Sequence, residues 1–211
     1  MPTKDETIDI YDHRMIHMGT MSREKAHRLG HWHKTFQCWI IGRPRQIYSV
    51  LLQLRHKNKA VFPDKLDKSA AGHLTAGEKV ADGLRELEEE LGIKVHFDDL
   101  IECGIIPLET PMESGGIDRE FCHVFLYRCD RTLHEFQIAE GEVSGLFWVA
   151  LTDFYDLVYG HASQVRAEGF VIRDDGTRIE ESRKIQADDL TPQSELYYER
   201  LFSAIKRQGW L

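Results

Sequence analysis

The sequence predicts an α/β (α+β) fold, and three observations indicate it. The 211 residues are 42% hydrophobic, which is enough for one globular domain with a sizeable core. Apolar and polar residues alternate in short stretches such as 32–40 and 119–128, as is typical of half-buried strands. Apolar residues also recur at the spacing of one helical face at Val80, Leu84, Leu87 and Leu91.

Before that helix, the pattern predicts a strand, a short helix and a hairpin of two strands, over residues 7–12, 22–29, 32–40 and 47–55. Ser22 is suited to capping the short helix. The turn Gly42-Arg43-Pro44-Arg45 joins the two strands of the hairpin. A lysine-rich loop over residues 56–71 then leads towards the main helix.

After the main helix, we expect strand residues within 94–107, 119–128 and 139–149, a helix over 151–159 and a hairpin over 169–178. Proline, serine and two adjacent glycines predict a loop over 109–118. Thr191-Pro192 suits the start of a last helix. We therefore expect a main domain over residues 1–160 and a C-terminal hairpin-and-helix extension over 161–211, which packs on the domain or on a partner.

The composition argues against binding to nucleic acid or to a membrane surface. The net charge is -8, and no basic stripe stands out. No apolar run approaches the ~20 residues of a membrane helix. The four cysteines show no metal-type spacing and are expected to be reduced core residues: Cys38, Cys103, Cys122 and Cys129. A soluble cytoplasmic protein is the expectation that follows.

The main helix carries an unusual concentration of acid. At roughly 100° per residue, its apolar stripe leaves Glu86, Glu89 and Glu90 in one arc, whereas Glu88 falls outside. Carboxylates three and four residues apart repel one another, but a hard divalent cation with oxygen ligands turns that repulsion into coordination. Arg85 precedes Glu89 by four residues and is placed to hold it. The alternative is a solvated acidic face.

The run from Arg85 to Ile93, R-E-L-x-E-E-x-G-I, resembles the core of the Nudix box, the signature of the Nudix hydrolase family. The resemblance implies a mixed β-sheet sandwiched between helices, a Mg²⁺ or Mn²⁺ cofactor, and cleavage of a diphosphate linked to another moiety. One departure is visible, because Glu78 and Arg85 enclose six residues instead of the usual seven. We expect the geometry of the three glutamates to survive, while the role of Glu78 stays open.

The resemblance also implies roles for individual residues. Glu86, Glu89 and Glu90, with a backbone carbonyl near Gly72, would hold the metal. Glu89 or the loop residue Glu142, which stands six before Trp148, would act as the base. Arg85 would orient the glutamates. Cations before the box would offset the charge of the substrate diphosphate, and the candidates are Arg55, Lys59 and Lys65.

A second resemblance covers most of residues 7–155. The runs KAHRLGHWHKTFQCWII, SAAGHLTAGE and DREFCHVFLY are similar to the isopentenyl-diphosphate isomerase branch of the same superfamily. That branch implies a second metal site, whose matching positions here are His27, His33, His73 and Glu120, with Asp118 as a further candidate. Imidazole and carboxylate suit Mn²⁺ or Zn²⁺. The chain has eleven histidines, so chance placement is the competing explanation.

Ala71 separates this chain from true isomerases, which have a catalytic cysteine before the Gly-His pair. Alanine can neither give nor take a proton, so hydrolysis is favoured.

The expected substrate is a small-molecule diphosphate, either a nucleoside diphosphate derivative or an isoprenoid diphosphate. The alternatives are an isomerase and a non-catalytic binding module. The aromatic residues considered for the organic part of the substrate are Trp32, Trp39 and Phe62, and a homodimer through the first strand or the last helix is a further expectation.

Overall fold

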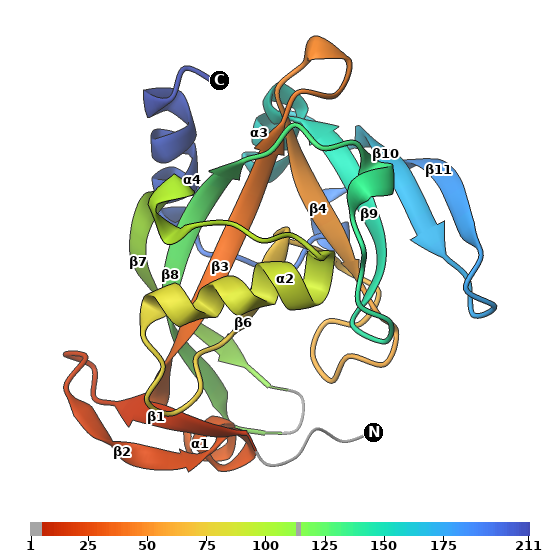
Figure 1. The fold of residues 1–211 in the computed structure, drawn as a ribbon. Coiled ribbons are helices and arrows are strands. Elements are labelled where there is room, and N and C mark those ends of the chain that lie inside the picture. The colour runs from red at the N-terminus through yellow and green to blue at the C-terminus, as the bar shows by residue number, and fades with distance from the viewer. Residues whose placement is uncertain (1–5, 113–114) are drawn as a thin grey trace.

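A computed structural model describes residues 6–112 and 115–211, and a large mixed sheet dominates them (Figure 1). The sheet has eleven strands, and its main path runs β11-β10-β9-β4-β3-β1-β2. The remaining strands attach to this path, with β5 on β4, β6 and β8 on β3, and β7 on β8. The predicted α/β class with a mixed sheet is therefore confirmed.

The strands are β1 (Thr7–Tyr11), β2 (His17–Ser22), β3 (Trp32–Gly42), β4 (Ser49–Arg55), β5 (Leu66–Asp67), β6 (Ala70–His73), β7 (Leu100–Pro111), β8 (Ile117–Arg128), β9 (Val143–Ala150), β10 (Val165–Ile172) and β11 (Arg178–Ile185). The α-helices are α1 (Arg23–Leu29), α2 (Arg85–Leu91), α3 (Leu151–Val158) and α4 (Glu195–Arg207). None of the helices in the described part of the chain is both long and apolar enough to cross a membrane.

Strand β3 lies at the centre of the sheet because it pairs with four other strands. It runs antiparallel to β1, β4 and β6 and parallel to β8. Its alternating side chains divide between two hydrophobic clusters. Phe36 belongs to the cluster that contains Leu87 of α2, whereas Trp39 belongs to the cluster that contains residues of α3 and α4. Helices therefore cover both faces of the sheet (Figure 1).

The main predicted helix has two parts. Val80–Leu84 forms a 3-10 helix, and α2 follows from Arg85. A 3-10 helix has fewer residues per turn than an α-helix, and it occupies the place where the box is one residue short. Gly83 allows the close approach to β3, since a Cβ there would lie 2.5 Å from Cβ of Phe36. Gly92 ends α2 in the left-handed conformation, with φ 67°, as predicted.

The structure differs from the expected elements in three places. Strand β2 was not foreseen. The predicted loop over 109–118 is largely a β-hairpin, since β7 extends to Pro111 and β8 starts at Ile117, while residues 113–114 of that loop lie outside the described residues. The last helix begins after Ser194, whose hydroxyl accepts a hydrogen bond from N of Tyr197. Ser22 does precede α1, but its side chain makes no capping bond.

The C-terminal part of the chain contacts the sheet at several points. Strand β10 pairs with β9, so the hairpin β10–β11 extends the main sheet. On the other side, the hydroxyl of Tyr197 in α4 donates to Oε1 of Gln37 (2.6 Å) and accepts from Nε1 of Trp39 (2.9 Å). Residues 161–211 thus pack on the rest of the chain, and their separation as an extension stays a prediction. The four cysteines are buried and unpaired, as expected.

Candidate active site

Arg85, at the first position of α2, is the residue to which the acidic side chains converge. Its guanidinium contacts Glu78 (2.9 Å), Glu86 (2.6 Å) and Glu89 (3.2 Å), and it donates to the carbonyl of His73 (2.7 Å). Glu78 also accepts a hydrogen bond from N of Thr75 (2.7 Å), so it ties the loop before the helix to Arg85. This contact gives Glu78 a structural role that the sequence left open.

Glu86 and Glu90 lie on the buried side of α2, against strand β6. The carboxylate of Glu86 rests on Gly72, where a Cβ would lie 2.0 Å from Oε1 of Glu86. Oε2 of Glu90 accepts from N of Ala71 (3.0 Å) and from Nε2 of Gln53 (3.2 Å). Gln53 was not among the residues predicted for the site, although a glutamine inside the apolar run of β4 was a visible signal.

Burial makes these two carboxylates costly to ionise without a cation beside them. It raises the pKa of Glu86 to about 7, and burial together with the charge of Glu86 raises the pKa of Glu90 to about 8. Two carboxylates on one buried helix face offer the oxygen ligands that a hard divalent cation prefers. The residues present therefore fit a Mg²⁺ or Mn²⁺ ion.

Glu89 and Glu142 complete the acidic side of the site. The side chain of Glu89 is 60% exposed, so it reaches solvent, whereas Glu86 and Glu90 do not. Glu142, in the loop before β9, pairs with Lys59 (2.7 Å). The charge of Glu142 contributes to the raised pKa of both Glu86 and Glu90, so this loop lies close to α2. The structure thus brings the loop glutamate and one predicted cation to the box.

The other two predicted cations are engaged elsewhere. Arg55 pairs with Asp67 (2.9 Å) and donates to the carbonyls of Val61 (2.8 Å) and Phe62 (3.1 Å). It therefore shapes the loop that carries Lys59. The ammonium of Lys65 contacts the carbonyl of Asp188, away from the box residues. A role for Arg55 and Lys65 in binding substrate stays a prediction.

A second group of side chains, of types that can bind metals, surrounds His73, the residue of β6 that follows Gly72. His27 of α1, His33 of β3 and His73 of β6 have ring centroids 5.0 to 5.3 Å apart. Oδ1 of Asp118 lies 3.4 Å from Nε2 of His33 and 3.6 Å from Nε2 of His27. Glu120 joins His33 and Asp118 in a set whose donor atoms lie within 4.8 Å of one another.

Four possible ligand atoms of this His–carboxylate cluster make no hydrogen bond within the described residues. The Nε2 atoms of all three histidines and Oδ1 of Asp118 are buried without a hydrogen bond. Nδ1 of His33 lies 3.1 Å from the carbonyl of His31, which favours the tautomer with a lone pair on Nε2. Burial lowers the pKa of His27 to about 3 and of His33 to about 4, so both are neutral near pH 7. This donor set fits a divalent metal.

Adjacent residues of β6 thus serve two different groups. The backbone of Gly72 contacts Glu86 of the box, while the ring of His73 belongs to the His–carboxylate cluster. Successive residues of a strand point to opposite faces of a sheet. The two candidate metal centres therefore lie on the two sides of one strand.

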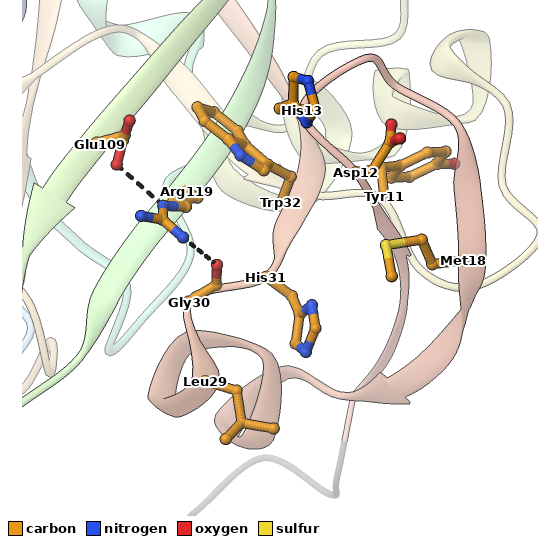
Figure 2. Close-up of a pocket in the computed structure, with 10 residues that line it drawn as sticks. All are labelled: Tyr11, Asp12, His13, Met18, Leu29, Gly30, His31, Trp32, Glu109 and Arg119. Carbon is orange, nitrogen blue, oxygen red and sulfur yellow. Dashed lines mark hydrogen bonds and ion pairs between the residues drawn. The ribbon is translucent and has the colours of Figure 1, made fainter.

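A cavity of about 520 Å³ opens at the connection between α1 and β3 (Figure 2). Gly30, His31 and Trp32, which connect His27 to His33, line it together with Tyr11. Arg119 closes one wall by pairing with Glu109 (2.9 Å) and donating to the carbonyl of Gly30 (2.9 Å). The rings of Tyr11 and Trp32 in the wall of the cavity suit a flat or apolar organic group.

Two other aromatic residues considered for the substrate lie elsewhere. Trp39 is buried in the core beside Phe154 and Tyr197, so its placement near the site was wrong. Phe62 belongs to the loop that Arg55 holds.

Comparison with known proteins gives the family. A model of the NUDIX domain matches residues 31–167. The chain belongs to the Nudix family. An uncharacterized Nudix hydrolase of Clostridium acetobutylicum is 35% identical over 202 residues, which span 96% of this chain and 98% of that protein. Nudix hydrolase 3 of Arabidopsis thaliana is 33% identical over 136 residues, which span 63% of this chain and 17% of that protein.

Solved structures agree with the Nudix assignment at the level of the fold. A protein of Deinococcus radiodurans superposes with a TM-score of 0.50 at 23% identity, over 69% of this chain and 83% of that one. A MutT/nudix family protein from Enterococcus faecalis superposes with a TM-score of 0.51 at 14% identity, over 83% of this chain and 61% of that one.

Proposed function

We propose that this Nudix protein is a Mg²⁺- or Mn²⁺-dependent hydrolase that cleaves a diphosphate linkage in a small molecule. The observation that carries the proposal is the acidic cluster on α2: Glu86 and Glu89 contact Arg85, and Glu86 also rests on Gly72. Glu90 is held beside them by Ala71 and Gln53, and the charges of Glu86 and Glu142 act on it. The proposed substrate is a nucleoside diphosphate derivative or an isoprenoid diphosphate. Four buried, unpaired cysteines suit the reducing cytoplasm as its location.

Each residue has a role in this proposal. Glu86 and Glu90, with the carbonyl near Gly72, hold the cation, and Arg85 keeps the acidic side chains in place. A bound divalent cation would polarise the phosphorus centre and lower the pKa of a water molecule. Glu89 or Glu142 accepts the proton of the attacking water, because both reach solvent. Lys59 offsets part of the negative charge of the diphosphate.

The direct test is a screen of diphosphate compounds with Mg²⁺ or Mn²⁺, in which the phosphomonoester and phosphate products are separated by ion-exchange chromatography and quantified. We expect turnover that requires the metal and one or a few preferred compounds. The failure of nucleotide, dinucleotide and isoprenoid diphosphates alike to be cleaved would leave a binding module as the better description.

The His–carboxylate cluster supports a second, more specific proposal. We infer that His27, His33 and His73, with Glu120 and Asp118, bind a Mn²⁺ or Zn²⁺ ion, as in the isomerase branch that the sequence resembles. Metal content of the purified protein, measured by atomic emission, should fall by about one ion per chain in His33→Ala. An unchanged metal content in that variant would contradict the site.

An isomerase of isopentenyl diphosphate is the alternative function that this cluster favours. Against it, Ala71 occupies the position of the catalytic cysteine, and its backbone N–H donates to Glu90. Incubation with isopentenyl diphosphate, followed by analysis for the dimethylallyl product, separates the two activities. We expect no isomerised product.

A further inference from the structure

Strand β11 forms one end of the sheet. It pairs with β10 along its whole length, from Arg178 to Ile185, and in the described part of the chain no strand covers its other side (Figure 1). An edge of this length presents a row of backbone N–H and C=O groups that can accept another strand. Most proteins prevent such pairing with charged side chains that repel a second copy.

The charges of β11 favour pairing with a second copy, because acidic residues precede Ser182 and basic residues follow it at matching distances. The segment reads I-E-E-S-R-K-I from Ile179 to Ile185, with two acids before the serine and two bases after it. If two copies pair antiparallel with Ser182 opposite Ser182, Glu181 stands opposite Arg183 and Glu180 opposite Lys184. Ile179 then stands opposite Ile185. Opposite charges at directly paired positions of an antiparallel ladder stabilise the pairing.

Neighbouring registers lose this match. A twofold axis perpendicular to the sheet keeps each side chain on its own face. The axis must therefore lie midway between two copies of the same residue, one on each strand. Centred on Glu181, the pairing would oppose two Glu181 side chains and would place Arg178 opposite Lys184. Centred on Arg183, it would oppose two arginines. The register about Ser182 therefore avoids the like-charge pairs that both of its neighbours contain.

The side chains of β11 are already placed for this pairing. Glu180, Ser182 and Lys184 are exposed on one face of the strand. On the other face, the guanidinium of Arg183 lies 4.5 Å from the ring centroid of Phe147 and 2.6 Å from Glu181. The carboxylate of Glu180 lies 3.6 Å from Nε2 of His134, and both side chains are exposed. Little side-chain rearrangement is therefore needed when a second strand arrives.

We propose that β11 is the interface of a twofold homodimer, in which the sheets of two copies join antiparallel about Ser182. The first strand, expected from the sequence to be dimer material, is not available for this purpose because β1 is paired with β2 on one side and β3 on the other.

Crosslinking tests the register directly. In Ser182→Cys, the two Cα atoms across the axis would lie about 4.5–5.5 Å apart, within the range of a disulfide. In Lys184→Cys, the matched control, the same two positions would lie about 13 Å apart, or four residues along the strand. Mild oxidation should give a covalent dimer for Ser182→Cys and not for Lys184→Cys or the wild type, whose cysteines are buried. Equal crosslinking of both variants, or of neither, would overturn the proposal.

Charge exchange tests the pairing without a new bond. Glu180→Lys and Lys184→Glu each place like charges opposite each other, so each should shift the protein to monomer in sedimentation equilibrium. The double variant E180K/K184E restores opposite charges and should return the dimer. Glu199→Lys, an equal charge change on the exposed side of α4, should leave the dimer intact.

The proposal fails if the wild type is monomeric at about 100 μM. It fails equally if the double variant is as monomeric as the single ones, or if Glu199→Lys dissociates the dimer, which would move the interface to α4.

Discussion

At Glu90, a carboxylate is enclosed between α2 and the strands β4 and β6 and has two donors but no basic partner in direct contact within the described residues. Glu90→Gln keeps the shape and one acceptor oxygen while removing the charge. We expect metal-dependent turnover to fall by about 100-fold, since one of the carboxylates proposed to hold the cation loses its charge. The melting temperature without metal should not fall, because a neutral amide replaces a carboxyl whose ionisation burial already disfavours, with its pKa raised to about 8.

Glu88 provides the matched control for that variant. It lies on the same helix but is exposed and pairs with Lys94 (2.9 Å) outside the site. Glu88→Gln should keep the turnover of the wild type. Wild-type turnover in Glu90→Gln, measured with Mg²⁺ as product formation from a substrate found in the screen, would remove Glu90 from the metal centre.

Asp67 is a second buried acid, but it has cations beside it. Burial alone would raise its pKa, yet Lys68 and Arg55 outweigh burial and hold the pKa below its usual range. A lowered folded pKa stabilises the fold above the unfolded pKa of about 4, and this contribution disappears as the pH falls through the folded value. At pH 7, Asp67→Asn should therefore lower the free energy of unfolding by about 3–5 kcal/mol, because Lys68 remains buried without its partner.

Urea denaturation at several pH values checks this prediction. The difference between wild type and Asp67→Asn should shrink towards acid pH, where the wild-type carboxyl is also neutral. Asp174→Asn is the control, since Asp174 is exposed and pairs with Lys57 (2.6 Å) on the surface. A pH-independent difference for Asp67→Asn would show that charge is not the cause.

At the scale of single elements, α4 is anchored to β3 through one hydroxyl group. Tyr197→Phe removes it and leaves Nε1 of Trp39 and Oε1 of Gln37 buried without that partner. We expect the free energy of unfolding to fall by about 2 kcal/mol. Tyr198→Phe is the control, because no hydrogen bond of its hydroxyl is found within the described residues. Equal stability of the two variants by chemical denaturation would contradict the anchor.

Elements with strong local signals could be predicted from the sequence. The alternation in β3 and β8 and the helix stop at Gly92 depend on residues close together in the chain, and all three are found in the structure. Strand β2 was missed because its residues, HMGTMS, contain a glycine and no clear alternation.

Other features depend on partners that are remote in sequence. Thr191 suited a helix start, but its hydroxyl donates to Asp67 (2.7 Å), so the helix begins three residues later. Trp39 was considered for the substrate as an aromatic side chain, and only the packing of α4 shows that it belongs to the core. For the site, the box residues followed from their spacing, whereas the contacts of Gln53 and Glu78 required the folded chain.

At the scale of the whole molecule, residues 161–211 complete the hydrophobic core. Leu201, Phe202 and Ile205 of α4 share a buried cluster with Phe154 of α3. A chain cut after residue 160 would expose this cluster and leave β9 without β10. We expect such a fragment to lack the near-ultraviolet circular dichroism and the cooperative unfolding of the full chain. Cooperative unfolding of the fragment would instead support the independent domain predicted from the sequence.

The bond between Gln37 and Tyr197 joins residues 160 positions apart. During synthesis, Oε1 of Gln37 in the central strand therefore cannot find this partner until α4 has left the ribosome. Folds that depend on such remote contacts form slowly, and their incomplete chains expose apolar surface. Nascent chains of this protein should accordingly be good clients for chaperones until α4 emerges.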